Sequence, residues 1–163
     1  MRAPRDTSTL SFSLQKLALP PAIAARAQSG AVNLVVIPCR PQPVIDPETV
    51  QQAGIAPGDV LALIDAVQCA FTWGLIDSHT APIGRGHAFE LLQALPAQKY
   101  SRLGTGLVRH VGITRADQLT DAQLRESGHA TAADFAEYWA SAVPDIPAAT
   151  NPWCWLIRFE LKG

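Results

Sequence analysis

The sequence lacks any long apolar run, although hydrophobic residues make up 48% of its 163 residues. No apolar stretch approaches the roughly 20 residues that a membrane-spanning helix needs. The hydrophobic side chains are instead divided among short segments, and charged residues account for only 17% of the chain, which is typical of a globular protein with a sizeable core. We therefore predict no membrane partner, a frayed N-terminus at residues 1–9, and one domain at residues 10–163.

Cysteine is scarce as well. The three cysteines are odd in number and far apart, at Cys39, Cys69 and Cys154, which favours reduced thiols over a disulfide framework. No Cys or His pair has the spacing of a zinc site, and we predict neither a metal nor a cofactor. Gln15, Lys16 and two prolines interrupt the mildly apolar N-terminal segment, so a signal peptide is not expected. Together these features predict a cytoplasmic protein.

One part of the chain has no basic residue. Residues 46–77 contain five acids and neither Lys nor Arg, whereas residues 1–45 and 78–116 each contain five Lys or Arg and a single acid. If the two basic segments meet in the folded chain, they can form a patch that faces phosphate groups. If they lie on different sides, they contribute only to solubility.

The strongest pattern in the sequence is the alternation near the C-terminus. Large apolar side chains recur at every second position there, at Trp153, Trp155, Ile157, Phe159 and Leu161. This period of two predicts a β-strand with one heavily buried face. Residues 31–37 are almost continuously apolar, which predicts a second strand that is buried on both faces.

Shorter patterns predict the remaining elements. Further strands are expected at residues 10–14, 60–64, 68–73 and 107–113. Helices are expected at residues 22–29, directly after Asp46, and at residues 87–95, 120–128 and 131–142, several of them with capping residues at their start. Strands with helices inserted between them predict an α+β fold, a small curled β-barrel with flanking helices.

Three motifs occur in an order that matches a known family. Residues 30–43 read G-A-V-N-L-V-V-I-P-C-R-P-Q-P, residues 57–59 read P-G-D, and residues 151–159 read N-P-W-C-W-L-I-R-F. They resemble the ASCH domain of the PUA-like barrels in its phage and prophage form. That form usually has G-R-K-T-Q-T-R-R-V-I-K-P-Q-P, a P-G-D turn before a strand, and a closing N-P-W-V-W-V-I-E-F. The resemblance covers about residues 15–161 and includes a looser match to a family helix at residues 119–128.

The resemblance implies a PUA-like barrel with a cleft for RNA or a nucleotide beside it. One bacterial branch of the family hydrolyses acetylcytidine with a Lys, a Thr and a Glu. The ungapped match puts these three on Val32, Val35 and Ser127, with Glu126 one position away. Valine can neither act as a base nor pair with phosphate. A step of one residue turns a helical side chain by about 100°, so Glu126 is expected to point elsewhere.

The resemblance thus favours a binding module that has lost the family's catalytic residues. In this hypothesis Asn33, the amide left in the apolar strand, contacts a base edge, and an exposed aromatic such as Trp73 or Tyr100 stacks on a base. Basic residues would rim the cleft and contact phosphate. The predicted nucleic-acid-binding residues are Asn33, Arg40, Arg85, Arg102, Arg109 and His110.

Two alternatives stay open. The chain could be an amidohydrolase or ribonuclease of the ASCH clan with a rebuilt active site, for which Asp65, Glu126 and Ser127 are the candidate catalytic residues. It could instead be a non-catalytic protein-interaction domain of prophage origin. In that case a protein partner or a second copy would cover an exposed apolar patch at residues 32–37.

Overall fold

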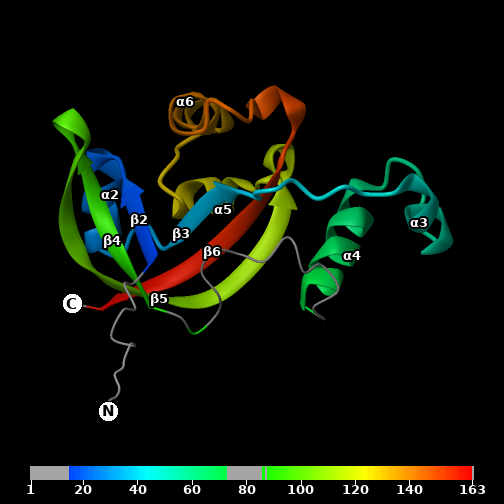
Figure 1. Ribbon diagram of the computed structural model, residues 1–163, viewed down its shortest axis with the longest axis horizontal. Coiled ribbons are helices and arrows are strands. Elements are labelled where there is room, and N and C mark those ends of the chain that lie inside the picture. Colours follow the sequence, from blue (N-terminus) through cyan, green and yellow to red (C-terminus); the bar gives the residue numbers. More distant parts are fainter. Residues whose placement is uncertain (1–14, 73–85, 87, 163) are drawn as a thin grey trace, which may run out of the picture.

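A five-stranded curled sheet with helices on both faces organises the chain (Figure 1). The computed structural model describes residues 15–72, 86 and 88–162. The strands are β2 (Gln15–Leu19), β3 (Leu34–Pro38), β4 (Ala88–Leu95), β5 (Lys99–Arg115) and β6 (Trp153–Lys162). The helices are α2 (Pro21–Gln28), α3 (Pro47–Gln52), α4 (Val60–Thr72), α5 (Asp121–Glu126) and α6 (Ala132–Ala142), with short 3-10 turns η2 (Pro96–Gln98), η3 (Ala116–Gln118) and η4 (Ala148–Thr150). The strand predicted at residues 10–14 lies outside the described residues.

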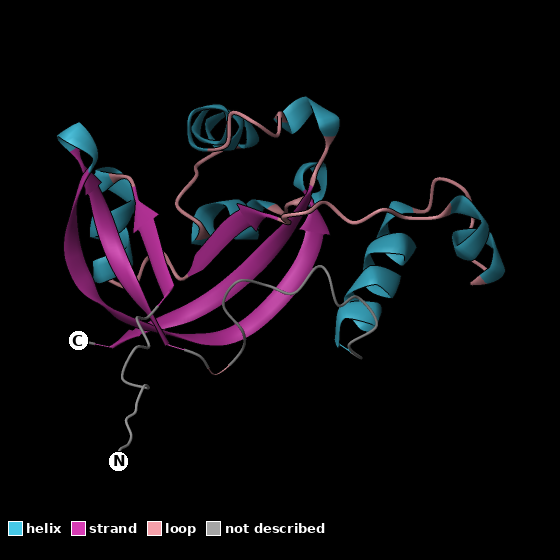
Figure 2. Cartoon of the chain, in the orientation of Figure 1, coloured by secondary structure: helices cyan, strands magenta, loops and turns pink. Residues whose placement is uncertain are grey.

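The strand order is β2-β4-β5-β6-β3, in which only β2 and β4 are parallel. The long strands β5 and β6 curve together, so the sheet forms a half-barrel (Figure 2). The predicted α+β class is confirmed, with a curled sheet and flanking helices. None of the helices in the described ranges has both the length and the apolar character that crossing a membrane requires.

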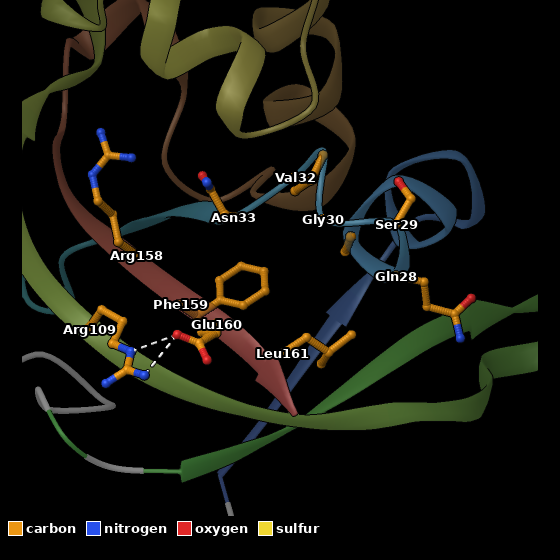
Figure 3. A pocket seen from close by; sticks show the side chains of 11 residues that line it. Gln28, Ser29, Gly30, Val32, Asn33, Arg109, Arg158, Phe159, Glu160 and Leu161 are labelled. Atoms are coloured by element: carbon orange, nitrogen blue, oxygen red, sulfur yellow. Dashed lines mark hydrogen bonds and ion pairs between the residues drawn. The ribbon is translucent and has the colours of Figure 1, made fainter. Parts of the chain in front are cut away.

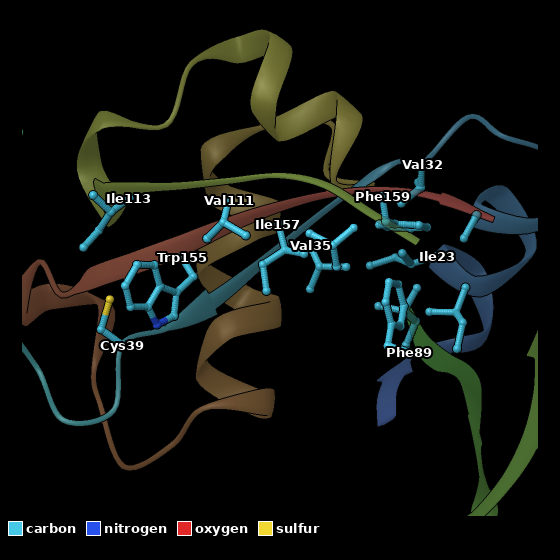
Figure 4. Close-up of a cluster of buried hydrophobic side chains, with 14 of the residues drawn as sticks. Ile23, Val32, Val35, Cys39, Phe89, Val111, Ile113, Trp155, Ile157 and Phe159 are labelled. Carbon is cyan, nitrogen blue, oxygen red and sulfur yellow. The ribbon is translucent and has the colours of Figure 1, made fainter. Parts of the chain in front are cut away.

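The closing strand β6 separates two clusters of buried side chains, as its alternation predicts. Trp153, Trp155, Ile157 and Phe159 lie in a first core together with side chains of α2, α4, β4 and β5 (Figure 4). On the opposite face, Cys154 lies in a second core beneath α5 and α6. The predicted burial of the neighbouring strand β3 on both faces is also confirmed, since its side chains alternate between the two cores.

Strand β5 is much longer than the predicted strand at residues 107–113, and a glycine explains how it fits its neighbour. The ring of Phe89 on β4 lies directly over Gly106, so that a Cβ atom at Gly106 would be 2.2 Å from Cζ of Phe89. The same ring packs edge-to-face on Phe159, with centroids 5.5 Å apart. A side chain at position 106 would therefore displace Phe89 from the first core.

Two strands predicted at residues 60–64 and 68–73 are wrong, because helix α4 occupies residues 60–72. The carboxylate of Asp59 accepts a hydrogen bond from the N–H of Ala62 at 3.1 Å, which is a helix N-cap. Val67 is buried in the first core, and Leu63, Ile64 and Phe71 pack against it at helical spacing. The apolar run thus follows the helical period of 3.6 residues. Trp73 lies outside the described residues.

The helix predicted at residues 87–95 is also wrong, because Ala88–Leu95 forms β4. Phe89 and Leu91 are both fully buried, with the period of two that a strand requires. Pairing with β2 on one side and β5 on the other overrides the helix-forming tendency of Leu, Gln and Ala.

The other predicted helices are confirmed, and their caps explain where they begin. Asp46 caps α3, Thr131 caps α6, and Thr120 forms a capping box with Gln123 at the start of α5. Phe135 and Trp139 of α6 are buried in the second core. All three cysteines are free thiols, and burial raises the pKa of Cys154 to about 12.

A buried histidine closes the second core at the end of α5. The ring of His129 lies against Phe135 and Tyr138, with centroids 5.3 and 4.9 Å away. Burial lowers the pKa of His129 below its ordinary value of 6.5, and the positive charge of Arg26 lowers it further, although Asp134 acts in the opposite direction. The neutral imidazole is therefore the form that the folded protein favours.

We expect Gly106→Ala to lower the free energy of unfolding by about 2–3 kcal/mol, since the added methyl group overpacks the Phe89 site. Urea denaturation measures the change. Gly112→Ala is the matched control, because a Cβ atom there would meet its nearest neighbour at 3.4 Å, an ordinary contact. Equal stability of the two variants would contradict the close packing of Phe89 on Gly106.

His129 gives the folded state a pH dependence whose sign is fixed. The unfolded chain binds the imidazole proton more readily than the folded chain does. The contribution of His129 to the free energy of unfolding is therefore fully present above pH 6.5. It is lost as the pH falls through the lower pKa of the folded state. His129→Gln should remove this part of the acid destabilisation, whereas exposed His110→Gln should not. Denaturation midpoints measured below pH 6.5 test the difference.

Candidate functional site

A cavity of about 600 Å³ lies between the end of α2 and the last part of β6 (Figure 3). Its floor is apolar and comes from Val32, Phe159 and Leu161, while polar side chains stand at its edges. The polar and charged lining residues are Gln28, Ser29, Asn33, Arg109, Arg158 and Glu160.

Backbone hydrogen bonds hold Asn33 at the edge of this cavity. The chain leaves α2 through Gly30, whose φ of +86° suits glycine. The N–H of Asn33 then donates to the carbonyl of Glu126 at 3.1 Å, and its carbonyl accepts from the N–H of Phe159 at 3.0 Å. The carboxamide of Asn33 is exposed and makes no hydrogen bond to any described residue, so its donor and acceptor face the cavity ready for a ligand.

A β-bulge in β5 sets Arg109 and His110 on the exposed side of the sheet. The register of β5 against β6 shifts between Val108 and His110, and two consecutive residues therefore escape burial before the core pattern resumes at Val111. Bulges that re-aim side chains in this way are common beside functional sites. His110 follows Arg109 directly, although it does not line the cavity.

Glu160 is held between two cations at the cavity rim. Nε and Nη2 of Arg109 donate to Oε2 of Glu160 at 3.1 and 2.7 Å (Figure 3), and Nζ of Lys162 donates to Oε1 at 2.9 Å. The hydrogen bond from Lys162, followed by that from Arg109, lowers the pKa of Glu160. Two cations and one carboxylate leave this group with one net positive charge.

Arg158 forms a second ion pair next to Asn33. Its Nη1 and Nη2 atoms donate to the two carboxylate oxygens of Glu126 at 3.0 and 3.1 Å, the bidentate geometry that suits a guanidinium best. Both side chains are half-buried. Glu126 is thus engaged by an arginine at the position where the ASCH motif usually has an acid.

The three candidate catalytic residues lie in three different environments. The Ser127 hydroxyl is buried and donates to the backbone carbonyls of Gln123 and Leu124. Glu126 is paired with Arg158, and Asp65 is exposed in the middle of α4 and does not line the cavity. Asp65 directly follows the strand predicted at residues 60–64, but that segment is helical.

The positions that the resemblance assigns to catalysis are part of the core. Val32 and Val35 are 2% and 5% exposed and belong to the first core, while Val36 belongs to the second. Helices of the chain cover this strand on both faces, and of the apolar residues at 32–37 only Ile37 is partly exposed. The large exposed apolar patch expected at residues 32–37 is therefore wrong.

The predicted basic residues line different cavities. Only Asn33 and Arg109 share the cavity above. Arg40 lines another cavity and pairs with Asp145, whose pKa it lowers through a hydrogen bond. Arg85 lies outside the described residues.

The two basic segments of the sequence meet at a third cavity, of about 530 Å³. Lys16 and Arg102 line it together with Glu90 and the exposed ring of Tyr100. Arg102 lies 3.4 Å from Glu90 in an ion pair. Two cations and one acid leave this cavity with one net positive charge as well.

Sequence reasoning missed the contributions of Gln28, Ser29, Arg158 and Lys162. Arg158 carries the clearest signal, because a cation stands in the closing motif where the family has an acid. The pattern alone gives no sign that its partner is Glu126, which is 32 residues away in the chain. Among the described residues, no group of three or more His, Cys, Asp or Glu side chains could hold a metal ion.

No model of a known protein family, no curated protein and no solved structure matches this chain. The ASCH resemblance therefore rests on the motifs themselves. The first and last of them form β3 and β6, which pair side by side. The P-G-D motif departs from the family pattern, since it leads into helix α4 rather than into a strand.

Removing either partner of the Arg158–Glu126 pair should lower the free energy of unfolding by about 0.5–1 kcal/mol, a small effect because both side chains are partly exposed to solvent. A double-mutant cycle of Glu126→Gln and Arg158→Gln measures the coupling energy. The coupling should shrink as salt is added. Strictly additive effects of the two substitutions would contradict a direct interaction.

Proposed function

We propose that the protein is a binding module for RNA or a nucleotide, built on a PUA-like barrel of the ASCH branch. The observation that carries the proposal is the cavity in which the free amide of Asn33 lies beside Arg109 and Arg158 above an apolar floor. Its volume of about 600 Å³ is within the usual range for small-ligand sites. The curled sheet and the adjacent β3 and β6 motifs support the family assignment.

Phosphate contacts would come from the guanidinium groups. A guanidinium has five N–H donors in a fixed plane. Arg109 directs Nε and Nη2 to Glu160, and its Nη1 makes no hydrogen bond to any described residue. Lys162 adds a second cation at the same carboxylate. This net positive rim suits a phosphate group that approaches from solvent.

Base recognition would come from the amide side. Asn33 offers one acceptor and two donor hydrogens, which can read the edge of an unpaired base. Gln28 and Ser29 add polar groups on the far wall, and Leu161 supplies an apolar surface below. The arrangement favours a single-stranded or free nucleotide over a duplex, because a base edge must enter the cavity.

Fluorescence anisotropy with a short labelled single-stranded RNA tests the proposal. Arg109→Gln should weaken binding about tenfold, the loss of one charge-assisted contact, and should lower the slope of affinity against salt by about one counterion. Asn33→Ala should weaken binding with little change in that slope. Arg40→Gln is the matched control, since Arg40 is also exposed and paired with an acid but lines a different cavity.

The proposal fails if neither RNA nor nucleotides bind at physiological salt. It also fails if Arg40→Gln weakens binding as much as Arg109→Gln does, because the interaction would then be a diffuse attraction to surface cations.

A further inference from the structure

Helices α3 and α4 lie at the other end of the molecule from α2 (Figure 1). An apolar groove lies between these two helices and the loops beside them. Two adjoining hollows of about 280 and 550 Å³ share the side chains of Ile45, Val50, Ile55 and Leu63. Val44 extends the wall of the first hollow and is 92% exposed. α3 buries none of its residues. Ile45 and Leu63 pack partly against the first core, whereas Val50 and Ile55 are only partly covered and belong to neither core.

The charged residues in and near this groove are acidic. Asp46 lines it, Glu48 is two residues further on in α3, and Asp59 is two residues after the lining residue Pro57, at the start of α4. Between residues 41 and 84 the sequence contains no Lys or Arg. The nearest preceding cation, Arg40, is paired with Asp145. The carboxylates around the groove thus have no basic neighbour within their own segment.

The walls of the groove determine how a partner can bind. Both long sides of the groove are helices, and the backbone N–H groups of a helix are engaged within it. The groove therefore offers no free sheet edge to which a strand of a partner could add. A partner has to insert side chains, as an amphipathic helix does. A second copy of this chain would bring two acidic faces together in a symmetric contact, and an anionic lipid surface would be repelled.

We propose that the α3–α4 groove binds a basic amphipathic helix of a partner protein. Leucine-like side chains at helical spacing would fill the two hollows, and lysine or arginine residues at their flanks would meet Asp46, Glu48 and Asp59. This surface is separate from the proposed nucleotide cavity and does not depend on it.

Synthetic peptides of about 15 residues provide the test. One peptide carries leucines at helical spacing with lysines on the flanks, a second replaces the lysines by glutamates, and a third scrambles the basic sequence. Anisotropy should detect binding of the first peptide only. The double variant Asp46→Asn and Asp59→Asn keeps both helix caps, because asparagine caps as well as aspartate does. It should weaken binding about tenfold at low salt.

Two further variants separate charge from apolar contact. Val44→Asn should weaken binding without affecting the fold, since Val44 is almost fully exposed. The double variant Asp121→Asn and Asp134→Asn removes two exposed acids from α5 and α6 and should leave the affinity unchanged.

Three results would overturn the proposal. Equal binding of the acidic and basic peptides would indicate unspecific apolar adhesion. Equal effects of the two double variants would indicate a response to net charge alone. A dimer in sedimentation that Val44→Asn dissociates would make a second copy of the chain the occupant.

Discussion

Burial of one face of β6 is the constraint on which the rest of the structure depends. Trp153, Trp155, Ile157 and Phe159 present a large apolar area, and neither strand neighbour could cover it alone. α2 and α4 complete the cover from one side. The opposite face of the same strand is buried beneath α5 and α6. Both cores therefore meet on β6, and loss of its pairing with β5 would expose both.

The same strand also builds the candidate site. Where the second core ends, the outward positions of β6 change from Cys154 and Leu156 to Arg158 and Glu160. Arg158 forms an ion pair with Glu126, and Glu160 forms one with Arg109. The apolar positions of the other face continue beneath the cavity as Phe159 and Leu161. An apolar floor with a charged rim is thus the direct result of alternation in a strand that extends beyond its covering helices.

The elements that follow from local chemistry could be predicted from the sequence. The alternation of β6, the continuous apolarity of β3 and the caps at Asp46, Thr120 and Thr131 all gave the observed elements. The strands predicted within α4 are wrong because an apolar run fits a helix and a buried strand equally well. The helix predicted at β4 is wrong because pairing with the neighbouring strands overrides helix propensity. Of the residues predicted to rim one cleft, Asn33 and Arg109 line the same cavity, whereas Arg40 and Arg102 line others. Their part in binding stays a prediction. The acids that pair with the arginines depend on tertiary contacts between distant segments, which no local pattern contains.

Although the net charge of the chain is near zero, the cavity rim carries net positive charge and the α3–α4 groove carries negative charge. β5 and β6 run between the α2 end of the molecule and helix α4 (Figure 1). Arg109 of β5 pairs with Glu160 of β6, and the N–H of Ile113 donates to Oε1 of Gln68 on α4. In the two proposals, each surface would attract a ligand of the opposite charge. An anionic ligand at the cavity and a basic segment at the α3–α4 groove could bind together, because the long ribbon of β5 and β6 keeps their charges apart.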